Sequence, residues 1–169
     1  MQKKKMENIS PWIEVFCNTQ ENQFFCTIEK EFIEDEFNLI SLNFQFSDLD
    51  KFLGVILSNS FFKRKNKLNF RNEVLELLYG LLHSRYIFTF SGIYKIFKKF
   101  SLGVFGSCSG FNCVNSNLLP FSPSDIPNRS LLKFFCPNCK NLYKSSYQGC
   151  SKVDGSFFGS RFLFFFLSA

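Results

Sequence analysis

Signatures of catalysis are missing from this 169-residue sequence. It contains one histidine, His83, and no second histidine that could be matched with a serine or cysteine nucleophile. A Walker loop, a dinucleotide-binding fingerprint and the Gly-rich, HRD and DFG motifs of kinases are all absent. Because His83 lies in the apolar context LLHSRY, we expect it to pack and hydrogen-bond inside the protein. The sequence therefore gives no support for an enzyme.

Long apolar runs are missing as well. The N-terminal lysines are followed by ENIS, so we expect no secretory signal. No window approaches the ~18 consecutive apolar residues of a membrane span, and the apolar end FLFFFLSA is far too short. Seven cysteines, an odd number, favour metal ligation in a reducing, intracellular compartment over a disulfide framework.

Alanine is nearly absent, whereas phenylalanine occurs 26 times, a bias that AT-rich coding can also produce. With 46% hydrophobic and 20% charged residues, the composition is typical of globular proteins. The net charge of +6 divides as +2 for residues 1–100 and +4 for residues 101–169. The basic runs at residues 3–5 and 63–67 are short, and most such runs are solvated, so we do not assign nucleic-acid binding to them.

The first hundred residues show helical patterns. Ser10 and Pro11 form an N-cap and first-turn pair ahead of WIEVFC, and Ser47 opens a helix with a single apolar face. In the acidic stretch IEKEFIEDEF, apolar residues alternate with groups of carboxylates. Most such carboxylate clusters lie on a solvated helix face. In residues 72–88 apolar side chains cover most of the circumference, as expected at the centre of a bundle.

Two further predictions concern the helices of this part and where they end. Gly80, within the central helix, suggests that another helix approaches its backbone closely. Thr89 caps a last helix that Gly103 ends. Beyond it Gly, Ser, Asn and Pro become frequent and short strand-like runs such as LLKFF appear. We predict two modules with little shared core, at residues 1–103 and 104–169.

Four cysteines in the second module form two pairs. Cys108 and Cys113 are a C-x4-C pair, Cys136 and Cys139 are a C-x2-C pair, and 22 residues lie between the pairs. This pattern suits one tetrahedral zinc ion bound by four thiolates, with no open position for catalysis. We therefore predict an α+β protein in which a helical domain precedes a zinc ribbon with an antiparallel sheet, stabilised by one structural zinc ion per chain.

Two other interpretations of the thiols stay open. A redox C-x2-C would stand at the start of a helix after a strand, but NLYKSSYQG follows here without a helical pattern. The four thiols could also be inert and buried. Cys17, Cys26 and Cys150 have no partner at ligand spacing, and we interpret them as structural.

Several stretches together suggest a family. In order and spacing, the chain resembles the regulatory (beta) subunit of casein kinase II from about residue 10 to residue 162. The stretches that carry the resemblance are WIEVFC, NQFFCTIEKEFIEDEFNL, LLYGLLHSRYIFTFSGI, FGSC, LLP, SDIP, FFCPNC and DGSFFG. The most specific of them are LYGLLHSRYI and the four-cysteine frame around SDIP.

The resemblance implies a non-catalytic, zinc-dependent homodimer that binds the catalytic subunits of casein kinase II in the nucleus and cytoplasm. It places the metal ligands on the same four cysteines. It also places Phe111, Leu142 and Tyr143 at the dimer interface, although core packing within one protomer would explain each of them nearly as well.

The chain departs from the family pattern in several places. SNSFFKRKNKLNF replaces an acidic loop, and MQKKKMENIS replaces an acidic, serine-rich start, so polyamine regulation and autophosphorylation there are in doubt. Ser109 replaces the usual Pro after the first ligand, and Ser122 displaces a Gly after LLP.

The C-terminal end departs as well. Family members continue beyond DGSFFG into an aromatic tail that binds the catalytic subunit. In this chain the aromatic residues after DGSFFG could form either a shortened contact with the catalytic subunit or a closing strand of the ribbon. We favour the strand. The residues are Phe162, Phe164, Phe165 and Phe166. We expect weaker binding of the catalytic subunit than is usual for the family, because aromatic anchors dominate such interfaces.

Two rival functions remain. A zinc-ribbon nucleic-acid binder would bind DNA or RNA with an affinity that falls steeply with salt. A reduced paralogue would dimerise without binding the kinase. Co-purification with the catalytic subunit distinguishes the regulatory subunit from such a paralogue.

Overall fold

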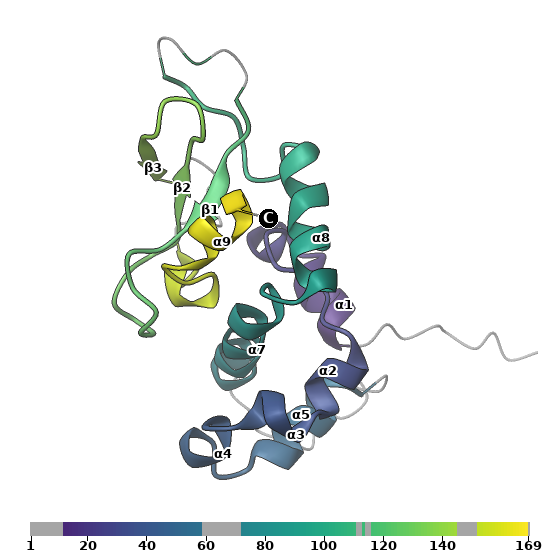
Figure 1. The fold of residues 1–169 in the computed structure, drawn as a ribbon. Helices are drawn as coiled ribbons and strands as arrows, with labels where there is room; N and C mark the ends of the chain where they lie inside the picture. Colours follow the sequence, from purple (N-terminus) through teal and green to yellow (C-terminus); the bar gives the residue numbers. More distant parts are fainter. Residues whose placement is uncertain (1–11, 59–71, 111–112, 114–115, 145–151, 169) are drawn as a thin grey trace, which may run out of the picture.

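The computed structural model describes residues 12–58, 72–110, 113, 116–144 and 152–168 (Figure 1). Helices precede a small antiparallel sheet, which confirms the predicted α+β class. In the first part the helices are α1 (Trp12–Cys17), η1 (Gln20–Asn22), α2 (Lys30–Glu34), α3 (Glu36–Leu39), α4 (Leu42–Gln45), α5 (Leu49–Ile56), α7 (Asn72–Tyr86) and α8 (Phe90–Ser101). The later elements are β1 (Leu119–Phe121), β2 (Lys133–Phe135), β3 (Leu142–Lys144), η3 (Gly155–Phe157) and α9 (Phe162–Ser168). The predicted Ser10–Pro11 cap lies outside the described residues.

Helix α7 is the central element, as its apolar circumference predicts. It contacts α3 and α5 on one side and η3 on another. The close approach expected at Gly80 is real, but the neighbour is the aromatic ring of Phe157 from η3 and not a helix backbone. Figure 1 accordingly shows α7 between the sheet and the group of helices α2 to α5.

Helix α8 begins and ends as predicted. The Thr89 hydroxyl accepts a hydrogen bond from the N–H of Gly92 at 3.0 Å, which satisfies a donor of the first turn. Gly103 follows the helix with φ of 67°, in the left-handed region that glycine adopts without strain.

The acidic stretch forms two short helices, α2 and α3, because Asp35 between them is extended. Its carboxylate accepts a hydrogen bond from the N–H of Phe37 at 3.0 Å and so starts α3. Helix α5 has the predicted single apolar face, but it begins at Leu49, after Asp48, two residues beyond the predicted cap Ser47.

The sheet has the order β1-β2-β3, and both pairs are antiparallel. Phe134 in the middle strand lies opposite Pro120 on one side and Tyr143 on the other. The strand-like run LLKFF thus contributes β2, whose Phe134 side chain is buried. Strand β3 lies at one edge of the sheet, whereas β1 contacts α9.

The predicted closing strand at the C-terminal end is wrong, because this segment forms helix α9. Phe162 and Phe166 stand four residues apart, and their rings lie 5.8 Å from each other. The Phe166 ring also packs on Phe97 and Phe100 of α8. Side chains at positions i and i+4 share one face in a helix, whereas in a strand the same face carries i and i+2. Packing against α8 therefore requires the helix.

The expectation of little shared core is also wrong. Phe24, from the helical part, packs its ring on Phe105 at 5.7 Å and on Phe134 of β2 at 5.1 Å. One cluster of buried side chains contains residues from both sides of the predicted boundary after residue 103. The boundary itself stays a prediction.

Candidate metal centre

Two tight turns present the four cysteines. In the first, the N–H of Cys113 donates to the Gly110 carbonyl at 2.9 Å. In the second, which joins β2 to β3, the N–H of Lys140 donates to the Cys136 carbonyl at 2.9 Å. Lys140 has a positive φ of 59°, which lets the chain turn back toward β3 within a few residues. Cys136 thus follows β2 directly, and Cys139 stands at the tip of the β2–β3 hairpin.

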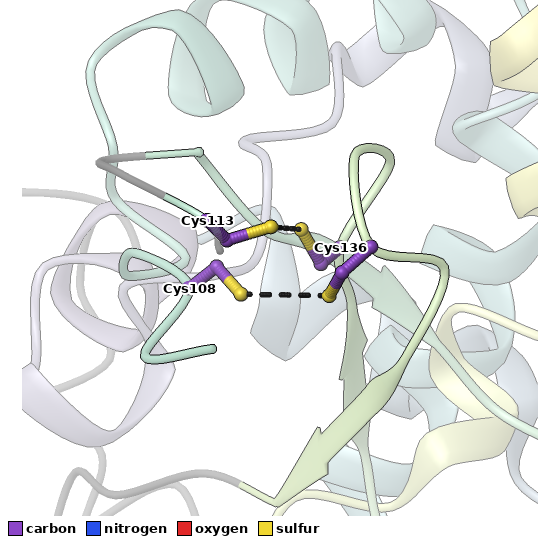
Figure 2. A group of neighbouring side chains, drawn as sticks. Cys108, Cys113 and Cys136 are labelled. Atoms are coloured by element: carbon purple, nitrogen blue, oxygen red, sulfur yellow. Dashed lines mark hydrogen bonds between the residues drawn. The ribbon is translucent and has the colours of Figure 1, made fainter. Parts of the chain in front are cut away.

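The four sulfur atoms converge. The Sγ atoms of Cys108 and Cys139 lie 3.7 Å apart, as do those of Cys113 and Cys136, and all four lie within 4.8 Å of one another (Figure 2). Four sulfurs at ~2.3 Å from one tetrahedral ion would be separated by about 3.8 Å. Disulfide sulfurs, in contrast, would be separated by about 2.05 Å. The cluster therefore fits a tetrahedral metal ion and not two disulfides.

Polar groups around the cluster are aimed at its sulfurs. The side-chain amide of Asn138 donates to Cys113 Sγ at 3.2 Å, and the N–H of Gly110 donates to Cys108 Sγ at 3.3 Å. The Tyr143 hydroxyl lies 3.2 Å from Cys108 Sγ and 3.3 Å from Cys139 Sγ. Such contacts orient ligands and stabilise the negative charge of thiolates.

The surroundings also set the ionisation of the thiols. Burial opposes ionisation of Cys136, but hydrogen bonds from Ser116 and from the N–H groups of Cys139 and Asn138 outweigh it and lower the pKa of Cys136 to about 6. The Tyr143 hydroxyl lowers the pKa of Cys139. Burial and its neighbouring thiols raise the pKa of Cys113 to about 12. Without a cation, four adjacent thiolates would repel one another, so a bound metal ion is what allows all four to be deprotonated.

The residues predicted for the dimer interface have different positions. Phe111 lies outside the described residues. Leu142 is 48% exposed on the edge strand β3, as an interface residue could be. Tyr143 directs its hydroxyl to the four-sulfur cluster, a role that the sequence did not predict, and its place at a dimer interface stays a prediction. The sequence signal for this role was the position of Tyr143, four residues after Cys139 and on strand β3 of the hairpin.

Of the four C-terminal phenylalanines, Phe162 is fully buried and Phe166 is half-buried against α8. Phe164, which is 70% exposed, presents the most surface. The Phe165 ring is partly covered by Phe88 at 5.2 Å.

The predicted structural role of His83 is confirmed. Its ring is fully buried, and burial lowers its pKa to about 4. Cys17 and Cys26 are buried too, and burial raises their pKa values to about 11 and about 12, so both thiols are protonated and unreactive at neutral pH. Cys150 lies outside the described residues.

Comparison with known proteins agrees with this architecture. The sequence model of the casein kinase II regulatory subunit family matches residues 11–169. The chain belongs to this family. Casein kinase II subunit beta-2 of Schizosaccharomyces pombe is 39% identical over 94% of the chain, and the putative subunit beta-4 of Arabidopsis thaliana is 38% identical over 94%. Subunit beta' of Drosophila melanogaster is 36% identical over 90%.

Membership of the casein kinase II regulatory subunit family confirms the resemblance given above, which is to a family of regulatory and not catalytic subunits. The chain spans 64% of the length of the S. pombe relative and 57% of that of the A. thaliana relative. Within the described residues, every helix is too short or too polar to span a membrane.

Proposed function

We propose that this chain is a non-catalytic regulatory subunit of casein kinase II, which binds one structural zinc ion, dimerises through its ribbon and docks the catalytic subunit. The observation that carries the proposal is a four-sulfur cluster of tetrahedral dimensions in a chain of this family. A reducing, intracellular location in nucleus and cytoplasm suits such a cluster, because free thiolates are needed for it.

Zinc is the metal that four thiolates favour in a closed tetrahedral site. The residues that would hold it are Cys108, Cys113, Cys136 and Cys139. The ion would fasten the turn before β1 to the β2–β3 hairpin, two segments that lie far apart in the sequence. In small modules zinc binding contributes on the order of 10 to 16 kcal/mol, so the fold of this region would depend on it.

The dimer would form at the exposed edge of the ribbon. Strand β3 is an edge strand, and unprotected edges readily pair with another chain. Leu142 adds an exposed apolar side chain there, and the contacts of Tyr143 with two ligand sulfurs would fix the strand relative to the metal. Dimerisation would thus depend on the ion.

Substitution of one ligand tests the metal and the dimer. We expect Cys136→Ser to abolish stoichiometric zinc, measured by elemental analysis, and to give monomers in sedimentation velocity. Cys17→Ser is the matched control, because it also removes a buried thiol but lies apart from the cluster. A Cys136→Ser protein that still sediments as a dimer would show that the interface does not need the metal.

Docking of the catalytic subunit would use the outer face of α9. Aromatic side chains are the commonest anchors of protein interfaces, and Phe164 is the most exposed aromatic side chain of this helix. We expect the chain to co-purify with the casein kinase II catalytic subunit at micromolar concentration, and Phe164→Ser to weaken that binding about tenfold.

Phe44→Ser is the control for this experiment, since Phe44 is also highly exposed but belongs to α4, which Figure 1 shows well apart from α9. If zinc-loaded, dimeric protein fails to retain the catalytic subunit at micromolar concentration, the regulatory function is wrong and the chain is a paralogue that only dimerises.

A further inference from the structure

Helices α3 and α4 lie at the end of the molecule opposite the sheet (Figure 1), and three apolar side chains close together in their sequence are exposed. Phe37 of α3 is 76% exposed, Ile40 is 57% exposed, and Phe44 of α4 is 93% exposed. Single exposed apolar residues are common, but several large ones gathered in eight residues are typical of a contact surface.

Phe37 and Ile40 border a hollow of about 670 Å³. Its lining combines apolar groups with two carboxylates; the residues are Glu36, Phe37, Leu39, Ile40, Asn43 and Asp50. We refer to it as the α3–α5 hollow. Its volume is in the range of sites that take an amino-acid side chain or a small ligand.

The backbone beside the hollow is held firmly. Arg85 of α7 donates to the carbonyls of Asn38 and Ile40 and, at 2.9 Å, to the Ser41 hydroxyl. The side-chain amide of Asn38 donates to the Phe32 carbonyl at 3.0 Å. The central helix thereby fixes the turn that exposes the apolar side chains. A surface fixed in advance loses little conformational entropy when a partner binds.

The chain segment that forms the hollow is strongly acidic. Residues 29–50 hold seven acidic residues and one basic residue, a net charge of −6, whereas the whole chain has +6, so the remainder carries +12. The acidic residues are Glu29, Glu31, Glu34, Asp35, Glu36, Asp48 and Asp50. In the hollow itself, neither Glu36 nor Asp50 forms an ion pair with any described residue.

We propose that the α3–α5 hollow docks a basic segment of another protein, one that presents an apolar side chain beside lysine or arginine. The apolar side chain would lie between Phe37 and Ile40, and the cations would face Glu36 and Asp50. Charge complementarity of this kind speeds association and selects the partner.

A second copy of the chain fits the hollow poorly. In a two-fold symmetric contact this acidic surface would face itself, and like charges would repel. Contact with the basic remainder of a second copy would be head to tail, which builds open chains unless the rotation closes. A different, basic partner meets neither obstacle.

The test uses fluorescence anisotropy with two labelled 16-residue amphipathic peptides, one of leucine and lysine and one of leucine and glutamate, on zinc-loaded full chain. We expect the lysine peptide to bind and the glutamate peptide not to bind. Phe37→Ser and Asp50→Lys should each weaken binding about tenfold. Phe90→Ser is the matched control, because Phe90 on α8 is 88% exposed but lies outside the hollow.

Equal binding of both peptides, or an equal loss with Phe90→Ser, would overturn the proposal, because the surface would then be merely adhesive. Self-association that Phe37→Ser abolishes, with peptide binding unchanged, would assign the surface to a second copy and overturn the proposal as well. Binding of the catalytic subunit separates this inference from the proposed function. Phe37→Ser should still bind the catalytic subunit, and Phe164→Ser should still bind the lysine peptide.

Discussion

At the scale of residues, His83 connects three segments that are distant in the sequence. Its Nε2 accepts a hydrogen bond from the N–H of Cys26 at 3.0 Å, so Nδ1 carries the proton and donates to the Phe157 carbonyl at 2.9 Å. The rings of Phe25 and Phe158 lie edge-on to the imidazole at 5.0 and 4.9 Å. In this apolar setting a second proton on the ring would cost its hydrogen bond from Cys26 and bury a charge.

Stability should therefore fall in mildly acidic solution. The pKa of His83 is about 4 in the folded protein and about 6.5 in the unfolded chain. As pH falls below 6.5 the unfolded state takes up a proton that the folded state does not, so the folded state loses about 1.4 kcal/mol per pH unit until pH 4. Above pH 6.5 the residue contributes no pH dependence.

Urea unfolding of zinc-saturated protein between pH 6.5 and 5.0 measures this effect. We expect a loss of about 2 kcal/mol over the interval. His83→Gln should be less stable at pH 7 but should lack this part of the pH dependence. Parallel curves for the two proteins would contradict the burial of a neutral histidine.

At the scale of elements, Gly80 and Gly54 provide opposite tests of helix packing. In α7 a methyl group at Gly80 would collide with the ring of Phe157, which η3 holds in place. We expect Gly80→Ala to destabilise the protein by roughly 1 to 3 kcal/mol in urea unfolding, because overpacking outweighs the better helix propensity of alanine.

Gly54 of α5 faces open space instead. Among the described residues, no neighbouring atom lies within 4 Å of the place that an alanine methyl group would occupy there. Gly54→Ala should therefore stabilise the protein by up to about 1 kcal/mol in urea unfolding, because alanine has the better helix propensity. If both substitutions stabilised the protein, η3 would not pack on α7 in the way that the Gly80 contact requires.

The elements also show what could be predicted from the sequence. The apolar stretch at residues 72–86 is long, and Thr89 and Gly103 mark the ends of α8, so both helices were predictable. Helix α9 is a short apolar run, which periodicity cannot distinguish from a strand; its packing on α8 decides the outcome. In the same way, the spacing of the four cysteines predicts the cluster, but the role of Tyr143 depends on the turn between β2 and β3.

At the scale of the whole molecule, the four-sulfur cluster and the central helix are connected through one core. Phe24 joins the helical part to Phe134 of β2, the strand that leads directly into the Cys136 turn. A second connection is the hydrogen bond between His83 of α7 and the carbonyl of Phe157 in η3, an element that follows the sheet in the sequence. Loss of the metal should therefore affect residues far from the sulfurs.

This connection predicts a single unfolding transition. During heating in the presence of a chromophoric zinc indicator, we expect the far-ultraviolet circular dichroism of the helices and the release of zinc to share one midpoint. A stoichiometric excess of chelator should lower that midpoint for both signals together, because ligand release and unfolding are linked. Two separate midpoints, with the helices outlasting the zinc, would show instead that residues 1–103 fold independently and that the aromatic contacts between the two parts contribute little.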